Sequence, residues 1–314
     1  MVAYTEKPKN EFDDMQDVEA VSRRRGNVPF VTLHTFPYWL LALTLLGIYV
    51  VALIRSQEDY QRIYDQLSEG IGTTLTIAVG AYLLALLIGL LVGVIRSTPP
   101  KTPDRKVGRR RYILHVLRTV AYNIATFYVE LMRGLPTLVF LLVMGFIFVP
   151  MLREWINEAL LPIVRTLLNN PEIPELTWRG RDIGTAIIGL ALIYGAFLSE
   201  IFRAGIQSVE RGQWEAARSL GMSPVQVLRL IVIPQAVRRV LPPLGNDFIS
   251  MIKDTSLVTI LGTNDITQIS RKWAGSTFQY LETFLILCFI YLVMTVIGSL
   301  LVQLMEQYLR TNEH

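Results

Sequence analysis

The chain has 314 residues, of which 52% are hydrophobic and 18% are charged, and its mean hydropathy is +0.40. This composition is too apolar for an ordinary soluble domain. A single cysteine, Cys288, excludes a disulfide or a cysteine metal site within one chain. Because the three histidines are scattered and lack metal-ligand spacing, no metal site is predicted.

Long apolar runs predict the fold class. Five uncharged windows are long enough to cross a bilayer, which takes roughly 17 to 25 residues. A sixth candidate at 240–263 contains Pro242 and Pro243, and we expect these prolines to break its helix. The sequence therefore predicts an all-α polytopic membrane protein with about six transmembrane helices. The five uninterrupted windows are 38–54, 71–95, 134–152, 183–199 and 283–305.

The segments between these windows predict a simple organisation. Residues 1–37 are polar and charged, unlike a secretory signal peptide, and predict a cytoplasmic tail. The window at 38–54 would add one transmembrane helix in front of a membrane domain at 70–308. Within that domain we expect a third span over about 122–150 and then an external insert at 151–182, which is partly irregular.

The distribution of charge predicts the orientation. The loop at 96–118 contains many lysines and arginines against the single acid Asp104. The loops at 55–70 and 153–182 contain more acids than arginines. Under the positive-inside rule the first loop is cytoplasmic and the other two are external. With six crossings, both termini and the loop at 207–237 are then cytoplasmic. The basic loop at 96–118 lies beside a membrane span and is therefore not expected to bind nucleic acid.

Two pairs of charged residues lie near the ends of apolar windows. Glu130 and Arg133 are three residues apart, as are Glu200 and Arg203, so each pair shares a helix face. Two interpretations remain open for them. The pairs could be interfacial ion pairs that anchor helix ends, or they could form an inner gate on a passage.

A second polar group lies inside the sixth candidate span. Charged side chains are costly in a bilayer unless they are paired or hydrated, so such residues are candidates for a substrate passage. A structural salt bridge between Lys253 and Asp254 is the alternative. Threonine hydroxyls near the start of the second window are further candidates, although such hydroxyls often bond back to their own helix. The passage candidates are Thr73, Thr74, Asn246, Asp247, Lys253, Asp254, Thr255 and Ser256.

The loop at 207–237 has the pattern of two short helices joined by a sharp corner. Ala216 and Ala217 favour a helix, and Glu215 suits its positive end. Gly221 can adopt the left-handed conformation that ends a helix. The sequence from Ser223 to Gln226, with Pro224 between them, then predicts a new helix with a capping box.

Motifs for catalysis are absent from the sequence. It contains no phosphate-binding loop of the G-x-x-x-x-G-K-[ST] type, so ATP hydrolysis is not expected on this chain. No serine lies in a G-x-S-x-G context. We therefore predict no catalytic residue and no enzymatic activity.

Together these motifs identify a family resemblance. Glu215-Ala216-Ala217, followed by Gly221 and by Ile231-Val232-Ile233-Pro234, resembles the EAA loop of permease subunits from bacterial ABC importers. Taken together with further matches, the order and spacing of the motifs over residues 70–308 resemble those of the polar amino acid uptake branch. The further matches are Gly72-Thr73-Thr74-Leu75, Glu130-Leu131-Met132-Arg133-Gly134-Leu135-Pro136-Thr137, Glu200-Ile201-Phe202-Arg203-Ala204-Gly205-Ile206, Gly212-Gln213-Trp214 and Lys253-Asp254-Thr255-Ser256-Leu257.

The resemblance implies a type I ABC importer permease (MetI-like) fold in the bacterial cytoplasmic (inner) membrane. It implies two ATPase subunits that bind ATP and Mg, a second permease that is identical or homologous, an extracytoplasmic amino acid-binding protein, and surrounding membrane lipid. This chain would hold no cofactor of its own. The extra span at 38–54 and the long insert at 151–182 depart from the compact pattern. The residues expected to couple the chain to the ATPase are Glu215, Ala216, Ala217, Leu220, Gly221 and Met222.

Two other functions stay open at the level of sequence. An ion-gradient-driven secondary transporter of small polar solutes could also use a broken helix and intramembrane charges, but it would not need the corner. A membrane scaffold or receptor that transports nothing is the third class, and the charges in the sixth candidate span argue against it.

Overall fold

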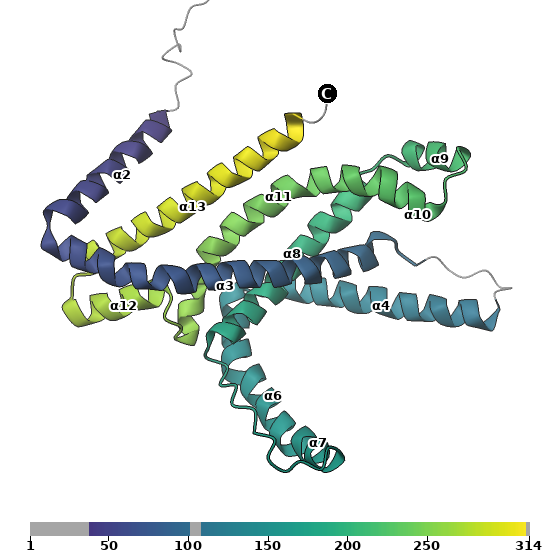
Figure 1. Ribbon diagram of the computed structural model, residues 1–314, viewed down its shortest axis with the longest axis horizontal. Helices are drawn as coiled ribbons and strands as arrows, with labels where there is room; N and C mark the ends of the chain where they lie inside the picture. The colour runs from purple at the N-terminus through teal and green to yellow at the C-terminus, as the bar shows by residue number, and fades with distance from the viewer. Residues whose placement is uncertain (1–37, 101–107, 312–314) are drawn as a thin grey trace, which may run out of the picture. The chain divides into compact units, whose positions relative to one another are not determined.

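The computed structural model describes residues 38–100 and 108–311, and within them every regular element is a helix (Figure 1). The prediction of an all-α chain is confirmed for these residues. The predicted tail at 1–37 and the basic stretch 101–107 lie outside the described residues.

The chain divides into two units, residues 1–51 and 52–314. The described part of the first unit belongs to helix α2 (Tyr38–Ser56), which contains the helix predicted at 38–54. Its apolar part, Leu41–Ser56, is shorter than the main membrane-spanning candidates. The second unit contains all the sites described below.

Four helical runs in the described residues are long and apolar enough to cross a membrane. They are α3 (Glu58–Ser97), the run Thr137–Leu167, α8 (Ile183–Gln207) and the part Tyr280–Gln307 of α13 (Tyr280–Thr311). Many of their side chains are exposed in the isolated chain, as expected for surfaces that face lipid. These runs agree with four of the six predicted crossings.

The predicted third span at about 122–150 has the wrong boundaries. Helix α4 (Arg109–Gly134) ends inside that window, and Leu135 is extended, with φ −94° and ψ 135°. Pro136 causes this break, because a proline disfavours the helical conformation of the residue before it and lacks an N–H. A new helical run then reaches Leu167, far into the predicted insert at 151–182. It consists of α5 (Thr137–Val143), a π-helical segment (Met144–Phe148), α6 (Val149–Trp155), a second π-helical segment (Ile156–Leu160) and α7 (Leu161–Leu167).

The core of the second unit forms where α3 and α8 pack along much of their lengths. Small residues on α3 make this approach close. A Cβ atom added at Gly93 would lie 2.7 Å from the carbonyl oxygen of Ser199 on α8, so only glycine fits there. Buried leucine and isoleucine side chains such as Leu190 and Leu198 fill the space around the contact.

Helix α11 (Ile233–Asp254) runs through Pro242 and Pro243 without a break, so the predicted break at these prolines is wrong. Neither proline can donate an N–H to the carbonyl four residues earlier. Those carbonyls belong to Arg238 and Arg239, two exposed residues.

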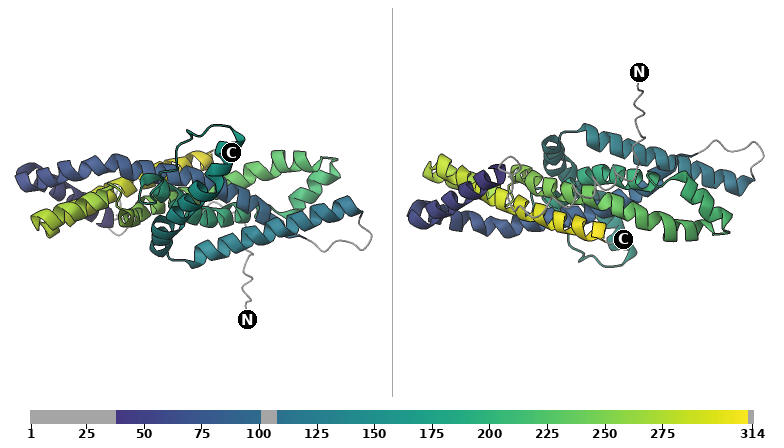
Figure 2. Two further views of the ribbon diagram at one scale, coloured as in Figure 1. Left: turned by 90° about the horizontal axis from the view of Figure 1, so that it is seen from below. Right: turned by 90° about the horizontal axis from the view of Figure 1, so that it is seen from above.

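The change in helix geometry comes twelve residues later. At Asp254 the α-helix becomes a 3₁₀ helix (Thr255–Leu261), which ends at Gly262 in the left-handed conformation, φ 73°. Helix α12 (Ile266–Thr277) then begins with Asp265 as its N-cap. In the views of Figures 1 and 2, α12 lies at the opposite end of this unit from α9 (Arg211–Ser219) and α10 (Pro224–Val227).

Candidate functional site

The corner between α9 and α10 has the predicted geometry. Gly221 has φ +77°, in the left-handed region. Its N–H donates to the carbonyl of Arg218 at 2.9 Å, and the N–H of Met222 donates to the carbonyl of Ala217 at 3.2 Å. These two bonds form a Schellman motif, which satisfies carbonyl groups at the end of α9.

The second helix of the corner starts with the predicted capping box. The hydroxyl of Ser223 accepts the backbone N–H of Gln226, and the side chain of Gln226 accepts the backbone N–H of Ser223 at 2.8 Å. Pro224 occupies the first turn, where its missing N–H costs no helical bond. A π-helical segment (Leu228–Val232) connects α10 to α11.

A small apolar cluster holds the corner together from inside. Ala217 is only 4% exposed and packs with Val227 and Val232. Met222 packs against the same cluster, which is the apolar contact that accompanies a Schellman motif. Of the predicted coupling residues, Ala217 and Met222 therefore stabilise the corner.

The outer face of the corner carries the other predicted coupling residues. Glu215, Ala216 and Gly221 are exposed, and Leu220 is 83% exposed. Within the described residues Glu215 forms no ion pair, so its carboxylate is accessible to a basic partner. An exposed leucine beside an exposed acid on a rigid turn is suited to contact another protein.

Two hydrogen bonds near the corner join α11 to the end of α8 and to α9. The guanidinium of Arg239 on α11 donates to the carbonyl of Ser208, which follows α8. The side-chain amides of Gln235 and Gln213 bond at 2.5 Å. A displacement of α9 would therefore be transmitted to α11, which is itself bonded to the end of α8.

The structure joins the two predicted charged pairs into one cluster with an additional arginine. The guanidinium of Arg96 on α3 bonds to Glu200 on α8, and Arg203 contacts the same carboxylate at 2.6 Å. Arg96 is only 9% exposed, and its Nε has no hydrogen-bond partner among the described residues. Burial with a single strong partner makes Arg96 depend on Glu200.

Glu130 and Arg133 belong to the edge of this cluster and do not pair with each other. Arg133 lies 3.9 Å from Glu200, and Glu130 lies 3.8 Å from Arg96. Arg96 is separated from Glu200 by 104 positions, so helix periodicity could not place it here. The available signal was the position of Arg96, a cation at the end of an apolar window.

The passage candidates at the end of α11 have different surroundings. The carboxylate of Asp254 accepts a hydrogen bond from the hydroxyl of Tyr194 on α8 at 2.9 Å. Lys253 is exposed and forms no ion pair with any described carboxylate. The alternative of a salt bridge between Lys253 and Asp254 is therefore wrong.

The remaining candidates of this segment differ in accessibility. Thr255 is buried, and its hydroxyl donates to the carbonyl of Ile252 at 2.6 Å. Asn246 is exposed, whereas Asp247 and Ser256 are half-buried. The assignment of these side chains to a passage stays a prediction.

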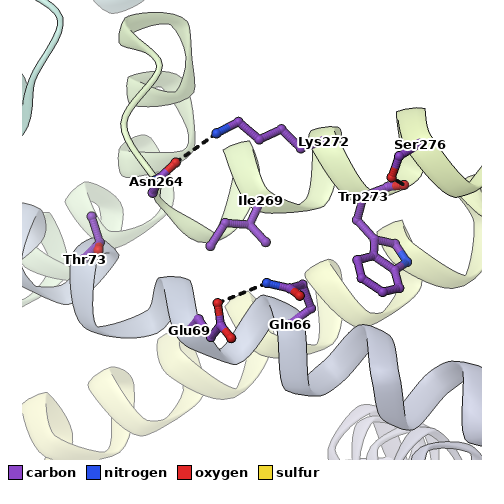
Figure 3. Close-up of a pocket in the computed structure, with 8 residues that line it drawn as sticks. All are labelled: Gln66, Glu69, Thr73, Asn264, Ile269, Lys272, Trp273 and Ser276. Atoms are coloured by element: carbon purple, nitrogen blue, oxygen red, sulfur yellow. Dashed lines mark hydrogen bonds between the residues drawn. The ribbon is translucent and has the colours of Figure 1, made fainter.

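The two threonines of α3 also separate. Thr74 is buried, and its hydroxyl oxygen accepts the backbone N–H of Ile266 at 3.1 Å, which ties α3 to the start of α12. Thr73 lines a pocket of about 530 Å³ between α3 and α12, with Glu69 and Lys272 on opposite sides (Figure 3). No residue of α11 lines this pocket, so Thr73 and the α11 candidates do not meet in it.

No group of three or more potential metal ligands occurs in the part of the chain that the structure describes.

Burial raises the pKa of the Asp265 carboxyl, while hydrogen bonds from Thr267 and Thr263 oppose that rise. Asp265 caps α12, which gives it a structural role.

Comparison with known proteins identifies the family. Residues 113–311 match the family described as binding-protein-dependent transport system inner membrane component. The probable amino-acid permease protein YxeN of Bacillus subtilis (strain 168) is 36% identical over 190 residues, 60% of this chain and 74% of that protein. The glutamine transport system permease protein GlnP of Escherichia coli (strain K12) is 28% identical over 191 residues, 61% of this chain and 77% of that protein.

A solved structure supports the same assignment. The crystal structure of an amino acid ABC transporter with histidines has a TM-score of 0.56 to this chain at 29% identity. The match covers 78% of this chain and 94% of that one. The family match includes α8, the corner, α11 and α13. The chain belongs to the family of binding-protein-dependent transport system inner membrane components.

Proposed function

We propose that this chain is the membrane-spanning permease subunit of an ATP-driven amino acid importer. In this role it forms the passage for the amino acid and transmits movement to that passage from separate ATPase subunits. The amino acid class is supported by the similarity to YxeN, a probable amino-acid permease protein, and to GlnP, a glutamine transport system permease protein, and by the motifs shared with the polar amino acid uptake branch. The chain itself would be non-catalytic, with ATP and Mg bound on the partner ATPase.

The proposed location is the bacterial inner membrane, with both termini and the corner in the cytoplasm. The charge distribution supports this orientation, because residues 96–118 are strongly basic and residues 55–70, most of which form the start of α3, are acidic. The proposed partners are an ATPase dimer at the corner, a second permease, an extracytoplasmic amino acid-binding protein on the other side, and lipid around the helices.

The geometry of the corner is the observation that carries this proposal. Its backbone is fixed by a Schellman motif and a capping box, and its inner face is packed. Its outer face presents Glu215 and Leu220 to a partner. A rigid turn that is bonded to α11, which is in turn bonded to the end of α8, can convert the movement of a docked motor into movement of two membrane helices.

The test is uptake by the reconstituted complex. The chain is reconstituted in proteoliposomes with its ATPase and binding protein, and uptake of a panel of radiolabelled amino acids is measured with and without internal ATP. We expect uptake that requires ATP and the binding protein and that survives collapse of ion gradients by ionophores. Uptake that stops with the ion gradient and ignores ATP would instead indicate a secondary transporter.

A further inference from the structure

A pocket at the opposite end of α8 from the corner is lined by three arginines. Arg179 and Arg181 precede α8, and Arg271 lies on α12. The pocket has a volume of about 510 Å³, and none of its lining residues is acidic. All three arginine side chains are exposed, so the pocket opens to the surface of this unit.

The arginines of this pocket lack ion pairs within the described residues, although Arg179 also lines a neighbouring pocket that contains Glu154, Glu158 and Glu175. None of the three arginines forms an ion pair with a described carboxylate. The only contact of their guanidinium groups found there is that of Arg181 with the ring of Phe146, at 5.8 Å. This contact leaves the edge of the Arg181 guanidinium able to donate hydrogen bonds.

The wall between the arginines is well ordered by local bonds. The hydroxyl of Thr259 bonds to the side-chain oxygen of Gln268 at 2.7 Å, which joins the 3₁₀ helix to α12. Gly262 closes the turn between them in the left-handed conformation. This bond and this turn hold the 3₁₀ helix against α12, the helix on which Arg271 lies.

Like charges that converge without a partner repel each other, so such a cluster is stabilised by an anionic ligand. Guanidinium groups bind carboxylates in a two-pronged geometry. A free amino acid carries at most one net negative charge, which cannot balance three arginines. A protein surface with several aspartates or glutamates can balance them.

We propose that this arginine-lined pocket docks acidic side chains on the extracytoplasmic binding protein. The inference rests on the proposed function for its orientation. Helix α8 has 25 residues and so is about 37 Å long, enough to put the pocket and the corner on opposite faces of a membrane. If the corner is cytoplasmic, the pocket faces the side from which the binding protein delivers its cargo.

The main experiment uses the full complex in nanodiscs of neutral phosphatidylcholine. The ATPase rate is measured against the concentration of the binding protein that supports uptake in the assay above. We expect the Arg181→Gln/Arg271→Gln double variant to raise the half-saturating concentration roughly tenfold and to weaken its dependence on salt. The saturating rate should stay unchanged, because the pocket lies at the far end of α8 from the corner.

Two variants control for charge and position. Arg181→Lys/Arg271→Lys keeps both charges and should stay close to the wild type. Arg62→Gln removes an exposed arginine on the N-terminal part of α3, which packs with α12, but that arginine is already paired with Glu58 at 3.0 Å. It should leave the half-saturating concentration unchanged.

Three outcomes would overturn the proposal. The first is an unchanged half-saturating concentration in the double Gln variant. The second is a reduced saturating rate at an unchanged half-saturating concentration, which would assign the pocket to the free substrate. The third is an effect that appears only when anionic phospholipid is added, which would assign it to lipid headgroups.

A direct binding measurement separates failure of this proposal from failure of the proposed function. A fluorescent penta-glutamate peptide, with penta-glutamine as its control, is titrated at low salt onto the chain in neutral nanodiscs. We expect the acidic peptide to bind the wild type and to lose most of its affinity for the double Gln variant. Equal affinity of the acidic peptide for the wild type and the double Gln variant overturns the docking proposal, whether or not the complex transports amino acids.

Discussion

Two groups of arginines in this chain have opposite electrostatic surroundings. Towards the corner, Arg96 and Arg203 share the carboxylate of Glu200. At the other end of α8, the arginine-lined pocket contains Arg181 and Arg271 without any acid. The arginines of the first group form ion pairs with a carboxylate of the same chain. No acid lines the pocket of the second group, and its arginines are exposed.

The difference separates a structural use of charge from a recognition use. A buried arginine without a partner is strongly destabilising, so the cluster at Glu200 has to be complete within the chain. Exposed arginines remain hydrated, so leaving them without an ion-pair partner costs the fold little stability. Changes at the Glu200 end should therefore alter folding, while changes at the pocket end should alter only binding.

The largest expected effect follows from removing the shared carboxylate. In Glu200→Gln, Glu130 is the one carboxylate among the described residues that stays near the buried Arg96, at 3.8 Å. We expect a loss of about 3 kcal/mol in the free energy of unfolding. Thermal unfolding in detergent should show a clearly lower midpoint, and uptake should fall with the amount of folded protein.

Glu200→Asp is the matched control, because it keeps the charge and shortens the side chain by one methylene. Its unfolding midpoint should lie between those of the wild type and Glu200→Gln. If Glu200→Gln unfolds at the same temperature as the wild type, the ion pairs of Glu200 do not stabilise the fold. The proposed difference between a structural role at Glu200 and a binding role at the pocket would then be wrong.

The second largest effect concerns coupling at the corner. We expect Gly221→Asp to abolish uptake while the protein remains folded and inserted in the membrane. Gly221 has φ +77°, and an added Cβ would meet no atom within 4 Å, so the strain is only that of the backbone, about 1 kcal/mol. The new carboxylate would lie on the surface proposed to contact the ATPase.

Gly221→Asn has nearly the same shape and no charge, and asparagine tolerates the left-handed conformation. It should retain much of the uptake. Pull-down of the ATPase with each variant identifies the step that is lost. Normal uptake by Gly221→Asp would contradict a docking role for the corner.

The sequence predicts the corner better than the charged cluster, for a physical reason. The turn at Gly221 and the capping box at Ser223 depend on residues a few positions apart, so local patterns are sufficient. The bond between Arg96 and Glu200 depends on how α3 packs against α8, which no local pattern contains. The exposed arginines of the pocket also come from separate segments and gather only in the folded chain.

The two errors in helix boundaries have different origins. The break at Pro136 follows from the rule that a proline disfavours the helical conformation of the residue before it. The prediction missed it because Pro136 lies inside the continuous apolar window 134–152. The continuity of α11 through Pro242 and Pro243 could not be read from the sequence, because local rules predict only that a proline weakens a helix. Local signals thus predict where a helix is weakened, and the tertiary environment decides whether it breaks.

A moderate effect is expected from Lys253, which resembles the pocket arginines in having no ion-pair partner among the described residues. We expect Lys253→Ala to lower the rate of uptake without changing thermal stability or releasing the ATPase. Lys253→Arg keeps the charge and should restore part of the rate. Unchanged uptake kinetics in Lys253→Ala would remove this residue from the passage.

The smallest effect is expected at the outer edge of the Glu200 cluster. The side chain of Glu130 is 69% exposed, and its distance of 3.8 Å from Arg96 is long for an ion pair. Solvent screens such a contact, so Glu130→Gln should cost about 0.5 kcal/mol or less. The comparison with Glu200→Gln is informative because both variants remove one carboxylate near the same arginine. Similar losses in thermal stability would mean that Arg96 depends on the total charge around it. A loss confined to Glu200→Gln would mean that it depends on one buried bond.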